Sequence, residues 1–323
     1  MAELTANETV TLRGRGQFLD PLFKYSTMFF SVVVLGVLGG IIAYLAWGSV
    51  EAFRTFGFGF LTSDAWNPAE EIHAFGALLP LYGTLMTAII AMLVGVPLSF
   101  GVAIFITEIC PTWAKRTLST AIELLAGIPS IIYGMWGAFT IAPLMQEYVE
   151  PFLIRTVGNA PLIGVLFKGP PFGVGILTAG FILAIMVLPF VSSITRDVFE
   201  TVPPMLKESA YGLGCTTWEV LWNIVLPYTK VGVVGGIMLG LGRALGETMA
   251  VTYVIGDGNY IRTSVLAPGK SIASTLALQF GSATESLYQS SLVALGFILF
   301  VLTFIVLAAA KVMLIRLQLR AGT

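Results

Sequence analysis

The 323-residue sequence has little charge and few reactive side chains. Asp, Glu, Lys and Arg make up 11% of it, whereas a soluble domain carries about 25%. Apolar residues make up 56% and the mean hydropathy is +0.89, which excludes a water-soluble fold of this size. The two cysteines, Cys110 and Cys215, show no metal-ligand spacing, and no disulfide framework or metal site is predicted.

Six long apolar runs dominate the sequence, and each exceeds the ~20 residues that a helix needs to cross a bilayer. Four of them contain no charge, the third contains Glu123, and the fifth contains Arg243 and Glu247. Helices satisfy their own backbone hydrogen bonds in lipid, so we predict an all-α, polytopic membrane protein with six transmembrane helices. The runs are 26–50, 74–107, 117–146, 169–195, 231–256 and 286–310.

The distribution of Lys and Arg predicts the orientation of these helices. Eleven of the 17 basic residues fall on the side that carries both termini, five fall on the other side, and Arg243 is the remaining one. By the positive-inside rule, the side with eleven is cytoplasmic. We therefore expect a cytoplasmic tail (1–25), a first transmembrane helix (26–50), an external loop (51–73), a core with five further helices (74–315) and a cytoplasmic tail (316–323).

The cytoplasmic loop 196–230 is longer than a connector needs. Pro203 and Pro204 stop the preceding helix, a short helix follows, and Gly214 ends it with a left-handed residue. A second amphipathic piece carries Trp218, Leu221, Trp222 and Val225 at helical spacing and closes at Pro227. This loop is either a helix pair lying on the lipid headgroups or a docking element for a cytoplasmic partner.

A signature within this loop resembles that of bacterial ABC-importer permeases of the MetI-like, type I fold. Ser209 replaces the usual first alanine of that signature, a small-for-small change. In that family the short helix inserts into a cleft of the ATPase subunit, so the resemblance implies a coupling role for the matching positions. These are Glu208, Ser209, Ala210, Gly214, Ile224, Leu226 and Pro227.

The stretch "GRALGET" (242–248) places Arg243 and Glu247 near the middle of the fifth run. A charge at that depth costs about 2.5–3.5 kcal/mol on insertion scales. Residues four apart share one face of a helix, so the two side chains can pair. One interpretation is a structural ion pair. The other is a polar lining for an oxyanion path, because the guanidinium suits bidentate recognition of oxyanions and the glycines of this helix predict close packing.

The third run holds two further candidates. Glu123 either lines the same path or lies at the headgroup level. In "AGIPSIIYGMWG" (126–137) Pro129 breaks the helix and Ser130 can satisfy the freed backbone groups. The small residues around them are typical of a span that gates or lines a pathway.

Together these motifs resemble the PstC-type permease subunit of phosphate-specific (Pst) ABC importers, over about residues 75–315. The resemblance implies that Arg243 and Glu247 belong to a phosphate path across the bacterial inner membrane. It also implies a PstA-type permease partner, two PstB-type ATPase subunits that bind ATP and Mg, and an extracytoplasmic PstS-type phosphate-binding protein. No nucleic-acid partner is expected.

An enzymatic role is not predicted. Residues 267–274 contain Gly269-Lys270-Ser271, but Ser264 stands where a phosphate-binding loop has its first glycine. Neither GxSxG nor HExxH occurs. Two alternatives remain: a related permease for molybdate, sulfate or a phosphonate, and an autonomous channel or secondary carrier, against which the loop 196–230 argues.

Overall fold

The computed structural model describes residues 19–67, 74–161 and 163–320. The chain forms two units, Met1–Gly48 and Ser49–Thr323. By length and composition, the described residues contain five helices able to cross a membrane, or six if one bent pair is a single span. The expected all-α, multi-pass fold is confirmed. The spans are Asp20–Phe56, Leu78–Ile109, Ile176–Glu200, Thr217–Gly246 and Ser286–Arg316, and the bent pair joins Thr112–Ala126 to Ser130–Thr156.

The first unit consists, in its described part, of helix α1 (Leu19–Gly48). The helix begins before the predicted start at residue 26 and includes Asp20 and Lys24. Its apolar side chains are exposed along most of its length, among them Phe29 and Leu35. Residues 1–18 of the predicted N-terminal tail lie outside the described residues.

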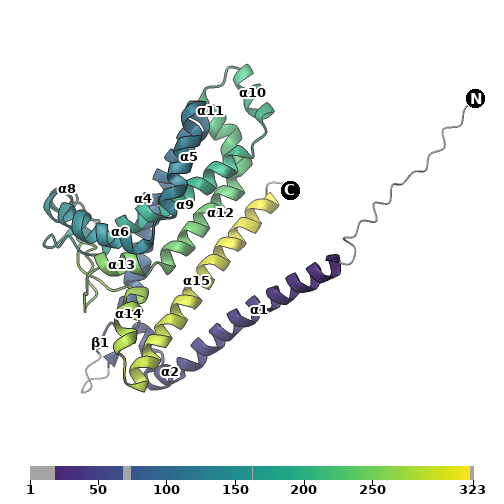
Figure 1. Ribbon diagram of the computed structural model, residues 1–323. Helices are drawn as coiled ribbons and strands as arrows, with labels where there is room; N and C mark the ends of the chain where they lie inside the picture. The colour runs from purple at the N-terminus through teal and green to yellow at the C-terminus, as the bar shows by residue number, and fades with distance from the viewer. Residues whose placement is uncertain (1–18, 68–73, 162, 321–323) are drawn as a thin grey trace, which may run out of the picture. The chain divides into compact units, whose positions relative to one another are not determined.

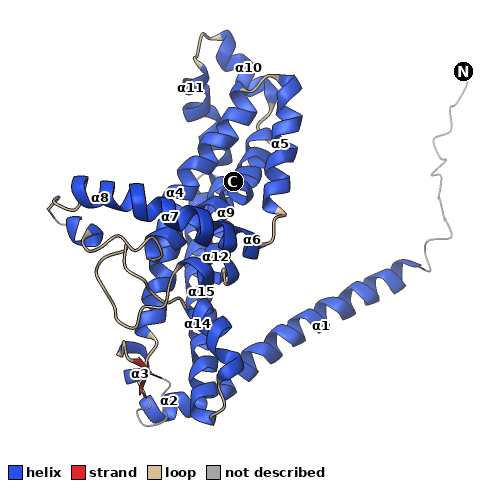
Figure 2. Ribbon diagram, turned by 60° about the vertical axis from the view of Figure 1, so that its left-hand side comes forward, coloured by secondary structure: helices blue, strands red, loops and turns tan. Residues whose placement is uncertain are grey.

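Three long helices form the centre of the second unit: α4 (Leu78–Ile104), α9 (Ile176–Glu200) and α12 (Leu226–Gly246). Figures 1 and 2 show them running side by side. They approach closely because small residues line their contacts: a Cβ on Gly95 of α4 would lie 3.2 Å from the carbonyl oxygen of Ala184 on α9. The buried core includes Ala91, Ile182, Leu183, Val187, Val191 and Leu245.

Short elements gather at one end of this unit, around the start of α15 (Ser286–Arg320) (Figure 1). They pack an aromatic core in which the Phe75 and Tyr288 rings stack 5.3 Å apart. The two-residue strands pair antiparallel, with Trp66 opposite Phe75. The elements are α2 (Val50–Phe56), α3 (Gly59–Thr62), β1 (Trp66–Asn67), β2 (Ala74–Phe75), α14 (Ile272–Gln279) and the 3₁₀ turn η7 (Phe280–Ser282).

The third predicted crossing is broken. Helices α5 (Thr112–Ala126) and α6 (Ser130–Trp136) meet at an angle of 87°, which confirms the predicted break at Pro129. Beyond α6 the chain continues through wider π-type turns. The following elements are η3 (Gly137–Ile141), α7 (Ala142–Leu144), η4 (Met145–Val149), α8 (Glu150–Thr156) and the 3₁₀ turn η5 (Gly164–Phe167).

The opposite end of the unit carries α10 (Pro204–Gly212) and α11 (Thr217–Val220) (Figure 1). A π-helical turn, η6 (Leu221–Val225), then leads directly into α12. The expectation that Pro227 closes the second piece is therefore wrong. The Leu226 N–H bonds the Leu221 carbonyl five residues back, and this wider turn lets a proline without a donor enter the helix.

Candidate functional site

Arg243 lies in the last turn of α12 and is exposed in the single chain. Its guanidinium carbon lies 5.7 Å from the centre of the Phe190 ring of α9, a distance at which a cation is attracted to an aromatic face. A different face of α12 packs tightly: Cβ atoms on Gly236 and Gly240 would press on Ile194 and Val191 of α9. The expected helix, with close packing on one face and a charge on another, is present.

The predicted continuous helix over 231–256 is wrong beyond Gly246. Glu247 has φ −71° and ψ 128°, which is extended backbone, and the chain becomes helical again in α13 (Met249–Val254). Arg243 and Glu247 therefore do not share the face of one helix, and no ion pair joins them in the described part of the chain. A helix interrupted at membrane depth is tolerated where its backbone is buried in protein or lines a water-filled cavity.

The structure brings the motif 126–137 against the residues that follow this interruption. Gly134 of α6 lies against α13, because a Cβ there would be 2.9 Å from the Cα of Ala250. Two segments more than a hundred residues apart in the sequence therefore pack together just beyond the interruption that follows Arg243.

The bend before α6 is stabilised by a residue that sequence reasoning missed. Pro129 precedes the first residue of α6 with extended ψ of 137°. No hydrogen bond of the Ser130 hydroxyl is recorded among the described residues, whereas the Tyr133 hydroxyl donates to the Leu125 carbonyl oxygen at 2.9 Å. The predicted role of Ser130 therefore belongs to Tyr133. A phenol four residues after a proline gives no distinctive sequence signal for this contact.

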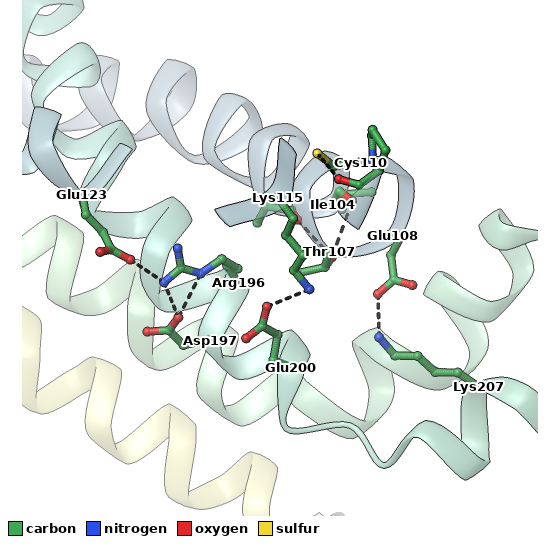
Figure 3. A network of polar contacts seen from close by, with 12 residues as sticks. Ile104, Thr107, Glu108, Cys110, Lys115, Glu123, Arg196, Asp197, Glu200 and Lys207 are labelled. Carbon is green, nitrogen blue, oxygen red and sulfur yellow. Dashed lines mark hydrogen bonds and ion pairs between the residues drawn. The ribbon is translucent and has the colours of Figure 1, made fainter. Parts of the chain in front are cut away.

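Glu123 does not lie with Arg243. Its Oε1 lies 2.8 Å from Nη2 of Arg196, which also contacts the Asp197 carboxylate at 2.7 Å (Figure 3). Lys115 of α5 pairs with Glu200 of α9 at 2.9 Å beside them. These ion pairs fasten α5 to α9, which favours the interpretation of Glu123 as a residue at the membrane boundary.

The α10 helix is joined to the π-helical turn that follows α4 by a fourth ion pair of Figure 3. The Lys207 ammonium lies 2.6 Å from Glu108, which belongs to the π-helical turn η2 (Phe105–Ile109). Both side chains are largely buried, at 19% and 6% exposure. Sequence reasoning did not identify this pair, because Glu108 and Lys207 are 99 positions apart.

The residues of the loop signature form the framework of α10 and α11. Ala210 is buried, Glu208 and Ser209 are exposed, and Ile224 and Leu226 are partly buried. Gly214 has φ +89°, which confirms the predicted left-handed turn. Thr216 begins the next helix through a capping box with Glu219.

Large apolar side chains project from this framework. We call Met205, Leu213, Trp218 and Trp222 the α10–α11 surface; all four are exposed. The two indole rings contact each other edge to face at 5.4 Å. The predicted apolar face is thus divided, because Leu221 and Val225 point into the core while the tryptophans remain outside. An exposed aromatic patch of this kind is typical of an interaction site.

The sequence matches the family described as binding-protein-dependent transport system inner membrane component, over residues 95–317. Curated relatives match over nearly their whole length. The chain is 55% identical over 303 residues to the phosphate transport system permease protein PstC of Mesorhizobium japonicum, covering 94% of this chain and 92% of that protein. It is 54% identical to PstC of Xylella fastidiosa strain 9a5c (99% and 98% covered). It is 36% identical to a probable PstC of Methanocaldococcus jannaschii (88% and 90% covered).

Solved structures support the fold. A bacterial ABC transporter involved in the import of alginate matches with a TM-score of 0.58 and 17% identity, over 94% of this chain and 96% of that one. Its complex with a periplasmic protein matches with a TM-score of 0.56 and 18% identity, over 93% and 94%. The family match, its curated relatives and the multi-pass helical fold define an inner-membrane permease of an ABC importer. The chain belongs to the binding-protein-dependent transport family and, within it, to the PstC permeases.

Proposed function

We propose that this chain, paired with a homologous PstA-type permease, forms the pathway by which inorganic phosphate crosses the bacterial inner membrane. The main supporting observation is the state of Arg243: exposed on the single chain, next to an interrupted helix, and free of any recorded ion pair with Glu247. A guanidinium held over an aromatic ring keeps its N–H groups available to an oxyanion. We assign to Glu247, four residues further along the chain, the role of competing for the guanidinium when no anion is bound, which permits release.

ATP hydrolysis is assigned to two PstB-type subunits, which also hold ATP and Mg. The α10–α11 surface is the proposed contact, because its exposed tryptophans and methionine suit insertion into an apolar groove. Phosphate arrives from an extracytoplasmic PstS-type binding protein on the opposite side. Both termini are then cytoplasmic, in line with the excess of Lys and Arg on that side.

The test is uptake of radiolabelled phosphate by proteoliposomes that contain the whole complex and internal ATP. Arg243→Gln is expected to lower uptake about 10- to 100-fold, the effect of losing one charge-assisted contact. Arg155→Gln is the matched control, because Arg155 is an exposed arginine on α8. Wild-type uptake by Arg243→Gln contradicts the proposed path.

The same assay separates the alternatives. Uptake suppressed more by molybdate or sulfate than by unlabelled phosphate identifies a permease for another oxyanion. Uptake that persists when the ATPase subunits are omitted identifies an autonomous channel or carrier. Uptake that requires both ATP and the binding protein supports the proposal.

A further inference from the structure

A buried lysine lies at the end of the second unit that is opposite the α10–α11 surface. The Lys270 side chain is 6% exposed. Its ammonium contacts Asn259 Oδ1 at 2.7 Å and Asp257 Oδ1 at 3.0 Å. An ammonium has three N–H donors, and in the described part of the chain partners are recorded for two of them. One donor of a charged group therefore remains for a ligand.

The backbone around this lysine is held rigidly. The Gly258 N–H bonds the Gly269 carbonyl at 3.4 Å, and the Gly269 N–H bonds the Ile255 carbonyl at 3.0 Å. These contacts bring Asp257 and Lys270 together from the two sides of a loop. Gly83 of α4 lies directly under the Lys270 carbonyl oxygen, with no room for a Cβ. Such fixed geometry is what a binding group requires.

Lys270 borders a polar cavity of about 470 Å³. Gln279 lies on its wall, and the Gln279 Oε1 accepts hydrogen bonds from Trp66 Nε1 at 2.7 Å and from the Tyr288 hydroxyl at 3.0 Å. Since its carbonyl oxygen is held by these two donors, the Gln279 amide has its NH₂ group as a donor for a ligand in this cavity. Tyr260 adds an exposed phenol to the same cavity.

This set of groups suits a tetrahedral oxyanion that carries a proton. The ammonium, the amide NH₂ and the phenol donate to anionic oxygens, while the Asp257 carboxylate, 68% exposed, can only accept. Inorganic phosphate retains a proton at neutral pH and can donate it to Asp257. Sulfate has no proton to donate there, so it meets the Asp257 carboxylate only as a like charge.

We infer that this cavity is a second oxyanion site, at which a protonated phosphate binds before it reaches Arg243. Helix α13 connects the two places: Glu247 precedes it and Asp257 follows it. Its six residues rise about 9 Å. Along the chain, one carboxylate thus lies on each side of this short helix. The inference deepens the proposed function and rests on it for the order of the two sites.

The experiment measures binding of radiolabelled inorganic phosphate to the permease–ATPase complex in nanodiscs, with the binding protein omitted. Arg243→Gln is used as the background, so that the second site is seen alone. In that background Lys270→Gln is expected to weaken phosphate binding at least about tenfold, as loss of a charge-assisted bond does. Lys168→Gln, at an exposed lysine, is expected to change nothing.

Asp257→Asn in the same background supplies a second readout at an exposed residue, where misfolding is a smaller concern. It is expected to let sulfate displace phosphate at least about tenfold more effectively, because the neutral amide no longer repels an anion without a proton. Unchanged binding in Lys270→Gln, or unchanged sulfate competition in Asp257→Asn, overturns the inference. A third outcome separates the two proposals. If Arg243→Gln retains wild-type uptake while Lys270→Gln loses phosphate binding, the proposed path through Arg243 is contradicted and the second oxyanion site is supported.

Discussion

The Lys207 ammonium of α10 lies 2.6 Å from the Glu108 carboxylate in the π-helical turn that follows α4. Helix α10 carries the family signature and the exposed residue Met205, whereas α4 belongs to the central helices of the second unit. The ion pair is therefore a direct polar link between the surface proposed to contact the ATPase and the helices that cross the membrane. A largely buried pair is geometrically specific, because each charge is poorly solvated without its partner.

Exchanging the two charges tests this link. Lys207→Glu and Glu108→Lys each leave two like charges facing each other, so each is expected to reduce ATP-driven phosphate uptake and to destabilise the complex by about 1–3 kcal/mol. The double variant restores an attractive pair and is expected to recover most of the uptake. The measurement is uptake together with the melting temperature of the purified complex. A double variant no better than either single variant contradicts the proposed link.

Gly214 is predicted to be required for its conformation rather than for its size. Its φ is +89° and nothing lies within 4 Å of a Cβ placed there. Gly214→Val is expected to distort the turn after α10 and raise the ATP hydrolysed per phosphate transported, because a β-branched residue is strained at positive φ. Strain of about 1–2 kcal/mol is expected for a side chain in this region. Gly214→Asn is expected to be milder, since asparagine tolerates left-handed backbone.

The neighbouring Gly212 provides the control for this variant. It also has open space around a Cβ, but its φ is not positive and it belongs to α10. Gly212→Ala is therefore expected to retain normal coupling. If substitutions at Gly212 and Gly214 change the coupling of ATP hydrolysis to transport equally, the left-handed turn at Gly214 is not required for coupling.

A paired comparison on α4 tests the packing beneath Lys270. Gly83→Ala places a methyl group against the Lys270 carbonyl oxygen, whereas Gly101→Ala meets nothing within 4 Å. Overpacking typically costs about 1–3 kcal/mol, so Gly83→Ala is expected to lower the melting temperature of the complex while Gly101→Ala leaves it nearly unchanged. Equal melting temperatures for the two variants would show that the loop moves aside without penalty.

The native cysteines report the orientation. Cys110 and Cys215 are both partly exposed and belong to the loops predicted to be cytoplasmic. A membrane-impermeant maleimide is expected to label them in inverted vesicles and not in sealed right-side-out vesicles. Lys168→Cys in a background without native cysteines is expected to show the opposite pattern. Labelling of Cys215 from the outside would reverse the assigned topology.

Much of the architecture could be predicted because it follows from local rules. The apolar runs are long enough to require helices in lipid, and Pro203 and Gly214 mark where α10 begins and ends because each restricts or permits particular backbone angles. The break at Pro129 follows from the same reasoning. Two predicted helix ends were wrong. At Pro227 the helix continues, because the preceding π-helical turn accommodates a residue without an N–H donor. At Glu247 the helix ends although no proline is present.

The sequence by itself determined that this protein lies in a membrane, how many times its apolar runs can cross it, and which loop carries the family signature, because hydropathy and backbone restriction act over short stretches of chain. The tertiary structure decided which charges meet. Arg243 lies over Phe190 rather than against Glu247, Glu123 pairs with Arg196, and the buried Lys270 pairs with the exposed Asp257. Such contacts join residues from different helices or from distant parts of one loop, and their formation depends on how those segments pack.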